Sequence, residues 1–87
     1  MSNVRLQLEL PEARVKQLEA LMHECGMDTK KELFNTALTL FEWVIGERKK
    51  GRIIASVDEE NSRYKELDIP AFAALKQHQL SKLSSLS

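Results

Sequence analysis

Histidine and cysteine are the side chains that most often bind metals or serve in catalysis, and this chain has few of them. His23 and Cys25 stand two residues apart, which on a helix directs them to different sides, and no second cysteine is present. His78 stands alone near the C-terminus. No serine–histidine–aspartate or cysteine–histidine arrangement and no glycine-rich phosphate loop occurs. The sequence therefore predicts no metal site, no cofactor and no enzymatic activity.

The charge of the chain is balanced, with 13 basic and 13 acidic residues among 87. Domains that bind nucleic acids usually carry a basic excess, so any such activity here must depend on local placement of charge. The single cysteine excludes an internal disulfide and fits a reducing compartment. Because no apolar run reaches about 18 residues and the N-terminus does not resemble a secretory signal, we expect a cytoplasmic protein without a membrane partner.

Residues 4–10 alternate strictly between apolar and polar side chains. Their sequence is Val-Arg-Leu-Gln-Leu-Glu-Leu. A period of two places the apolar side chains on one face of a strand and Arg5, Gln7 and Glu9 on the other. Pro11 ends this pattern and suits the first turn of a helix. The sequence therefore predicts a half-buried strand followed by a helix.

Two helices are expected after the strand. The first runs from Pro11 to Cys25, with apolar residues at helical spacing and a left-handed stop at Gly26. The second starts at Thr29, because Thr29 and Glu32 match a capping box, although Asp28 could be the cap instead. It closes at Gly51. Its apolar residues form two stripes that one short neighbouring helix cannot cover: Leu33, Ala37, Leu40 and Val44, and Phe34, Leu38, Phe41 and Ile45.

These elements predict a symmetric dimer. A lone strand has no partner for its backbone hydrogen bonds, and a core of this size needs help from a disulfide, a metal or oligomerisation. A two-fold axis would pair the strand with its own copy and pack the second helices across the axis. The expected dimer core is Leu6, Leu8, Leu10, Leu33, Phe34, Ala37, Leu38, Leu40, Phe41 and Val44. The alternative is that the strand pairs within the chain, with residues 52–57.

The order of strand, proline, helix, glycine and capped helix resembles the ribbon-helix-helix (Arc/MetJ-like) family of DNA-binding proteins. The similar stretch is VRLQLELPEARVKQLEALMHECGMDTKKELFNTALTLFEWVIGERKKG, somewhat more than half of the chain. The resemblance implies a mainly α fold with a short β ribbon, as an intertwined symmetric homodimer. Residues 1–51 would form the dimerisation and DNA-binding domain.

The same resemblance implies where double-stranded DNA would bind. The paired strands of the family enter the major groove, so Arg5, Gln7 and Glu9 would contact bases. Arginine can donate two hydrogen bonds to guanine and glutamine can pair with adenine. Thr29, Lys30 and Lys31, at the start of the second helix, would contact phosphates.

Glu9 departs from this pattern, because a carboxylate is repelled by phosphates. It could accept a hydrogen bond from a cytosine amine, or it could pair with Arg5 across the ribbon. A third option is that the ribbon does not bind DNA strongly.

Residues 52–87 form a C-terminal extension that the resemblance does not cover. A β-branched run at 52–57, a turn at 58–62 and a loosely alternating run at 63–69 suggest a short hairpin. Residues 71–76 suggest a short helix, and residues 81–87 are expected to be frayed.

The leading functional hypothesis is a transcriptional regulator, acting as a repressor. One alternative is an antitoxin whose extension binds a toxin protein. Another is a protein-interaction module that has lost DNA binding.

Overall fold

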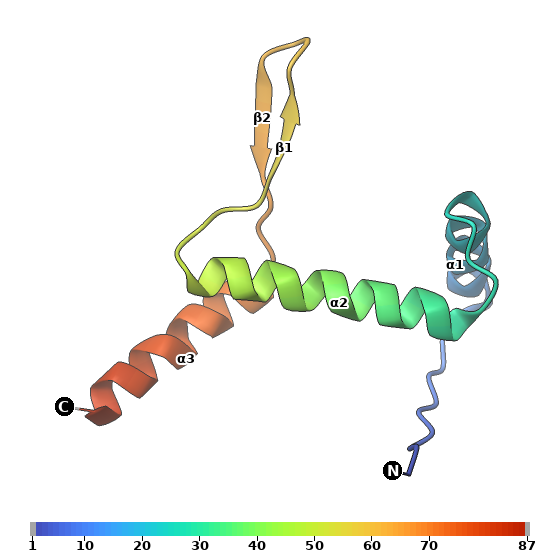
Figure 1. The fold of residues 1–87 in the computed structure, drawn as a ribbon, viewed down its shortest axis with the longest axis horizontal. Helices are drawn as coiled ribbons and strands as arrows, with labels where there is room; N and C mark the ends of the chain where they lie inside the picture. Colours follow the sequence, from blue (N-terminus) through green and yellow to red (C-terminus); the bar gives the residue numbers. More distant parts are fainter. Residues whose placement is uncertain (1, 87) are drawn as a thin grey trace. The chain divides into compact units, whose positions relative to one another are not determined.

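The computed structural model describes residues 2–86 and is mainly helical, with one two-stranded antiparallel sheet (Figure 1). The elements follow in the order α1 (Glu12–Glu24), α2 (Lys30–Lys49), β1 (Ala55–Asp58), β2 (Arg63–Glu66) and α3 (Pro70–Leu86). The chain divides into two units, of which one ends at Ala37 and the other begins at Leu38. The expected class, mainly α with a short β element, is confirmed at this level.

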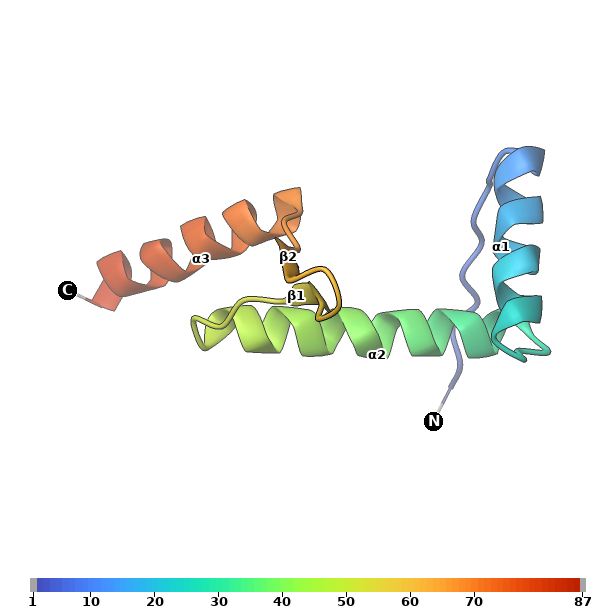
Figure 2. The same cartoon turned by 90° about the horizontal axis from the view of Figure 1, so that it is seen from above.

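The N-terminal segment, residues 2–10, has no helix or strand in the single chain (Figure 2). The strand expected over residues 4–10 is therefore not formed here, because no second strand supplies its hydrogen bonds. The alternative of pairing with residues 52–57 is wrong, since residues 55–58 pair with residues 63–66 instead. Val4, Leu6 and Leu8 remain 83%, 74% and 76% exposed.

α1 and α2 end where their glycines predicted, each with the same pair of backbone hydrogen bonds. After α1, the N–H groups of Gly26 and Met27 donate to the carbonyls of His23 and Met22. Gly51 and Arg52 repeat this arrangement at the end of α2, donating to Arg48 and Glu47. Both glycines have positive φ angles, +67° and +79°, which a side chain would disfavour. Both helix ends are therefore fixed by local sequence.

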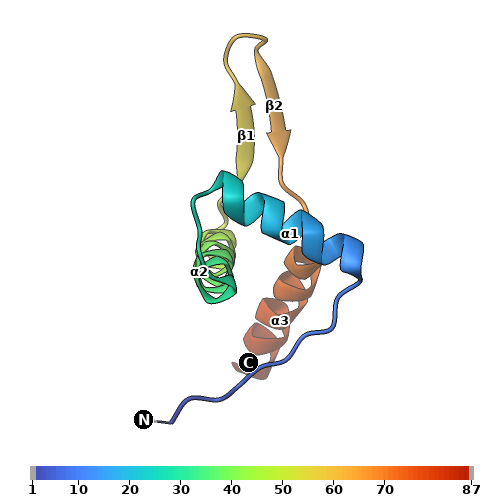
Figure 3. The ribbon, with the colours of Figure 1, turned by 90° about the vertical axis from the view of Figure 1, so that its right-hand side faces the viewer.

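The hairpin β1–β2 confirms the predicted turn. Ala55 pairs with Glu66 and Asp58 with Arg63. The Asp58 carboxylate accepts hydrogen bonds from the side-chain and backbone N–H groups of Asn61, at 2.9 and 3.3 Å. These bonds, the side-chain one first, hold the pKa of Asp58 below its usual value. Figures 1 and 3 show the hairpin projecting away from α3.

α3 is much longer than the short helix expected over residues 71–76. It runs from Pro70 to Leu86, so the end expected to be frayed, residues 81–87, is helical as far as Leu86. Proline is favoured at the first position of a helix. No glycine or further proline follows it, so the sequence contains no signal that would end the helix early.

The hydrophobic core is small in both units. The buried hydrophobic side chains among the described residues are Met22 in the first unit and Val44 and Phe72 in the second. The Arg48 guanidinium lies 4.8 Å from the centre of the Phe72 ring, where a cation is attracted to the ring face. Arg52 also forms an ion pair with Glu47 at 2.8 Å, and this hydrogen bond lowers the pKa of Glu47. In the second unit, the contact of Arg48 with Phe72 thus connects the end of α2 to the start of α3.

Replacement of Phe72 tests this connection. Phe72→Ala removes a side chain that is 5% exposed and should lower the free energy of unfolding by about 3 kcal/mol. Hydrogen exchange should then show faster exchange of amides in the hairpin and α3. Leu80→Ala, which truncates an exposed side chain on α3, should change the free energy by no more than about 0.5 kcal/mol. Equal effects of both variants would contradict this account.

Candidate nucleic-acid interface

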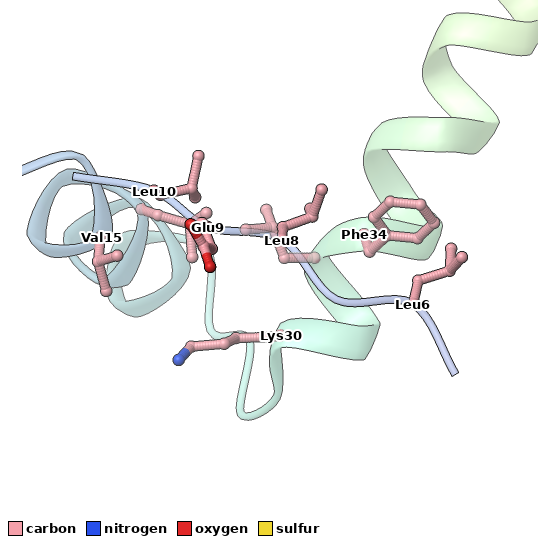
Figure 4. Close-up of a pocket in the computed structure, with 9 residues that line it drawn as sticks. Leu6, Leu8, Glu9, Leu10, Val15, Lys30 and Phe34 are labelled. Carbon is pink, nitrogen blue, oxygen red and sulfur yellow. The ribbon is translucent and has the colours of Figure 1, made fainter. Parts of the chain in front are cut away.

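The apolar and polar side chains of the N-terminal segment differ in whether they line a cavity of the first unit. An apolar cavity of about 660 Å³ lies in the first unit, and Leu6, Leu8 and Leu10 line it (Figure 4). Arg5 and Gln7 do not line it and are exposed. Two of the three expected base-contacting residues therefore lie outside the cavity that the leucines line.

The cavity is built mainly from apolar side chains of three segments. Its full lining is Leu6, Leu8, Glu9, Leu10, Val15, Leu18, Lys30, Leu33 and Phe34. Although the leucines line the cavity, they stay largely exposed to solvent. The described chain therefore leaves an uncovered apolar surface beside an N-terminal segment whose backbone forms no ladder.

Glu9 is the polar residue of the segment that does not follow the alternation. It lines the cavity together with Lys30, and both side chains are drawn in Figure 4. Among the described residues, no ion pair joins Glu9 to Lys30. Glu9 thus brings a negative charge close to the start of α2, where phosphate binding was expected.

The start of α2 is capped by Thr29, as the capping-box pattern predicted. The Thr29 hydroxyl accepts a hydrogen bond from the Glu32 N–H at 3.1 Å, and the Thr29 carbonyl accepts the N–H of Leu33. The return bond differs from a standard capping box. The Glu32 carboxylate accepts the N–H of Asp28, at 3.0 Å, rather than that of Thr29. The Thr29 hydroxyl can still donate its own proton, because a hydroxyl both donates and accepts.

Lys30 and Lys31 follow the cap and are exposed. Their position in the first turn of α2 combines two positive charges with the positive end of the helix dipole. Glu32 sits in the same turn and opposes this charge. Asp28 directly precedes the cap, so over residues 28–32 the side-chain charges balance, as they do over the whole chain.

The residues expected in a dimer core fall into two groups. Within the single chain, Val44 is buried and Leu33 is half-buried. Phe34, Leu38 and Phe41 follow one another at helical spacing on α2 and are 46%, 44% and 45% exposed. The others are also exposed: Leu6, Leu8, Leu10, Ala37 and Leu40.

Two residues of α1 were missing from the expected core. Val15 and Leu18 line the cavity with the leucines of the N-terminal segment. Their spacing of three residues on the apolar stripe of α1 could have identified them. The hairpin carries another uncovered pair, Val57 and Tyr64, which are register partners and both exposed. The pKa of Tyr64 is raised, first by partial removal from water and then by the neighbouring Glu66 carboxylate.

No family model matches this chain, and the searches of curated proteins and of solved structures found no similar protein. Among the described residues, no group of three or more histidine, cysteine, aspartate or glutamate side chains is placed to hold a metal ion. Cys25 is exposed. In the same part of the chain, every helix is too short or too polar to cross a membrane.

Substitution of Thr29 tests the cap. Thr29→Ala removes the oxygen that accepts the Glu32 N–H and should lower the free energy of unfolding by about 1 kcal/mol. Thr29→Ser keeps the oxygen and should leave stability nearly unchanged. Urea unfolding followed by circular dichroism measures both. A serine variant as unstable as the alanine variant would show that the methyl group, rather than the hydrogen bond, matters.

Proposed function

We propose that this protein is a dimeric DNA-binding regulator of the ribbon-helix-helix type, acting as a transcriptional repressor. In the dimer, the N-terminal segments of two copies pair as an antiparallel ribbon that enters the major groove. One observation carries the proposal: Leu6, Leu8 and Leu10 are uncovered beside an apolar cavity between the segment, α1 and α2.

A second copy meets both needs of the segment at once. Its backbone requires hydrogen-bond partners over residues 4–10, and a two-fold related segment supplies them along the whole length. Its leucines require apolar cover, and the exposed face of α2 formed by Phe34, Leu38 and Phe41 offers such a surface in the partner. A two-stranded hairpin alone is marginally stable in water, so the helices must provide most of the stability.

The polar side of the same segment is suited to base recognition. Arg5 and Gln7 lie outside the cavity. In a ribbon they project away from the helices, where arginine can bind guanine and glutamine can bind adenine. Thr29, Lys30 and Lys31 lie in the same unit as the segment, and Lys30 lines one cavity with Glu9. Phosphate contacts there would set the position of the ribbon in the groove.

The neutral total charge of the chain determines how much of the proposed DNA affinity can be nonspecific. Nonspecific affinity comes mainly from contacts between basic side chains and phosphates. The dimer offers few such contacts outside the starts of its two α2 helices. Binding should therefore be weak on random DNA and should depend on direct contacts to bases.

Self-association is tested by placing a charge on the apolar side of the ribbon. Leu8→Asp should weaken dimer formation by roughly tenfold or more, because a carboxylate is costly to bury without a partner. Sedimentation equilibrium measures the change. Leu80→Asp introduces the same charge at an exposed leucine of α3 and should leave the dimer intact. A dimer that tolerates Leu8→Asp would refute the buried face of the ribbon.

DNA recognition is tested on a sequence selected from a random pool. Arg5→Ala should cost about 1–3 kcal/mol of binding free energy and relax specificity at one base pair. Lys30→Ala and Lys31→Ala should weaken binding to all sequences alike, and each should reduce the log–log salt slope by about 1 for every phosphate that its lysine neutralises. Lys65→Ala, on the hairpin, is the control of equal charge. Unchanged affinity in Arg5→Ala would remove Arg5 from the interface.

A second candidate function is binding of another protein, such as a toxin, through residues 52–87. The hairpin favours it, because Val57 and Tyr64 face each other in the register and both remain exposed. The buried Phe72 argues against a wholly free tail. The two functions are compatible, since the residues proposed to contact DNA lie in the first unit and residues 52–87 in the second.

A further inference from the structure

We propose that Arg5 and the partner's Glu9 form an ion pair across the ribbon, twice in each dimer, and that these pairs set a strand register centred on Gln7. The inference rests on the proposed dimer. It adds a role for Glu9, the residue that DNA recognition leaves unexplained, as a positioning residue for Arg5.

Symmetry restricts the possible registers. When two antiparallel strands are related by a two-fold axis, residues directly opposite each other lie on the same face of the ribbon. The axis must therefore pass beside a residue that is opposite its own copy. Within the alternating segment the candidates that leave a useful overlap are Leu6, Gln7 and Leu8.

The register centred on Gln7 uses the whole segment. Val4 then lies opposite the partner's Leu10, and Leu6 opposite the partner's Leu8, so the apolar face is continuous. Arg5 lies opposite the partner's Glu9. All residues from 4 to 10 are paired.

The two neighbouring registers pair the charged residues less favourably. With the axis at Leu8, Arg5 lies opposite the partner's Pro11, which has no N–H to donate, and Glu9 lies opposite a glutamine. With the axis at Leu6, Glu9 lies opposite the partner's Asn3, outside the alternating pattern. Neither register brings opposite charges together. Direct cross-strand pairs of opposite charge stabilise a sheet and like pairs destabilise it, so charge favours the axis at Gln7.

The single chain leaves both groups available for this pairing. Arg5 and Glu9 are exposed, and neither takes part in an ion pair among the described residues. Lys30 is an intrachain competitor for Glu9, because both line the same cavity (Figure 4). A strand held in the ribbon directs Glu9 to the polar face, away from the leucines that line this cavity.

The pairing has a consequence for recognition. The outer face of the ribbon would carry a central pair of Gln7 amides flanked by two ion pairs, with no net charge. Glu9 would hold each guanidinium in place while leaving donors free, since an arginine has five N–H groups. The same ion pairs would favour pairing with a strand that also carries a basic residue at position 5 and an acidic residue at position 9.

A charge-swap experiment on the full chain tests the register. Arg5→Glu and Glu9→Arg each create two like-charge pairs and should weaken their own homodimers by about tenfold. Mixing the two variants restores both ion pairs, so heterodimers should exceed the statistical half in native mass spectrometry. The double variant Arg5→Glu/Glu9→Arg should recover the affinity of the unsubstituted homodimer.

Two controls separate the possible results. Arg63→Glu and Glu66→Arg, on the hairpin, change net charge equally and should mix statistically, which excludes long-range attraction as the cause. Lys30→Ala should leave the heterodimer preference unchanged; loss of the preference in this background would assign Glu9 to Lys30 and overturn the inference.

Statistical mixing of the Arg5 and Glu9 variants, with dimers intact, would overturn the register but not the ribbon. An unsubstituted chain that does not dimerise would overturn both. A heterodimer preference without DNA binding would support the register and refute the proposed function.

Discussion

The unpaired backbone of the N-terminal segment is the constraint on which the first unit depends. Over residues 4–10 the N–H and C=O groups form no ladder, while every second side chain is apolar and three of these, Leu6, Leu8 and Leu10, line a cavity that the chain does not fill. A segment of this kind can satisfy its backbone in water, or it can cover its leucines, but the single chain does not do both. Pairing with a second strand resolves the conflict, and the alternation determines which side chains then face outward.

The two units differ in how many of their side chains and strands find partners within the single chain. The second unit has a buried Phe72, an arginine over its ring, an ion pair between Glu47 and Arg52, and a paired hairpin. The first unit buries Met22 alone among its described hydrophobic side chains. Its open apolar surface and its base-reading candidates lie in one short segment. Pairing of two N-terminal segments would therefore both cover the apolar surface of the first unit and form the proposed DNA-binding surface.

Features set by local bonds could be predicted from the sequence, and features that need distant partners could not. Gly26 and Gly51 located both helix ends because the bonds that end a helix join residues within the last turn. The cap at Thr29 and the turn over residues 58–62 could be predicted for the same reason. The strand over residues 4–10 has a clear periodicity, but its ladder requires a second strand. The length of α3 was missed because a serine-rich chain end suggested fraying, although no glycine or proline there stops the helix. The contact of Arg48 with Phe72 joins two elements that no sequence pattern links.

The chain contains two segments that could pair with a second copy, and their charges distinguish them. On one face of β2, Arg63 and Lys65 are both basic. Symmetric antiparallel pairing of β2 with its copy would place Arg63 opposite Lys65, or Lys65 opposite itself, and like charges in such positions are unfavourable. β1 carries Asp58 with no opposite charge in the strand to meet it. Charged side chains on exposed strands are a common protection against edge pairing. In the N-terminal segment the two charges have opposite sign and equal distance from Gln7, so the same symmetry that penalises β2 favours this segment. Charge order would thereby direct self-association to the segment that also presents Arg5 and Gln7.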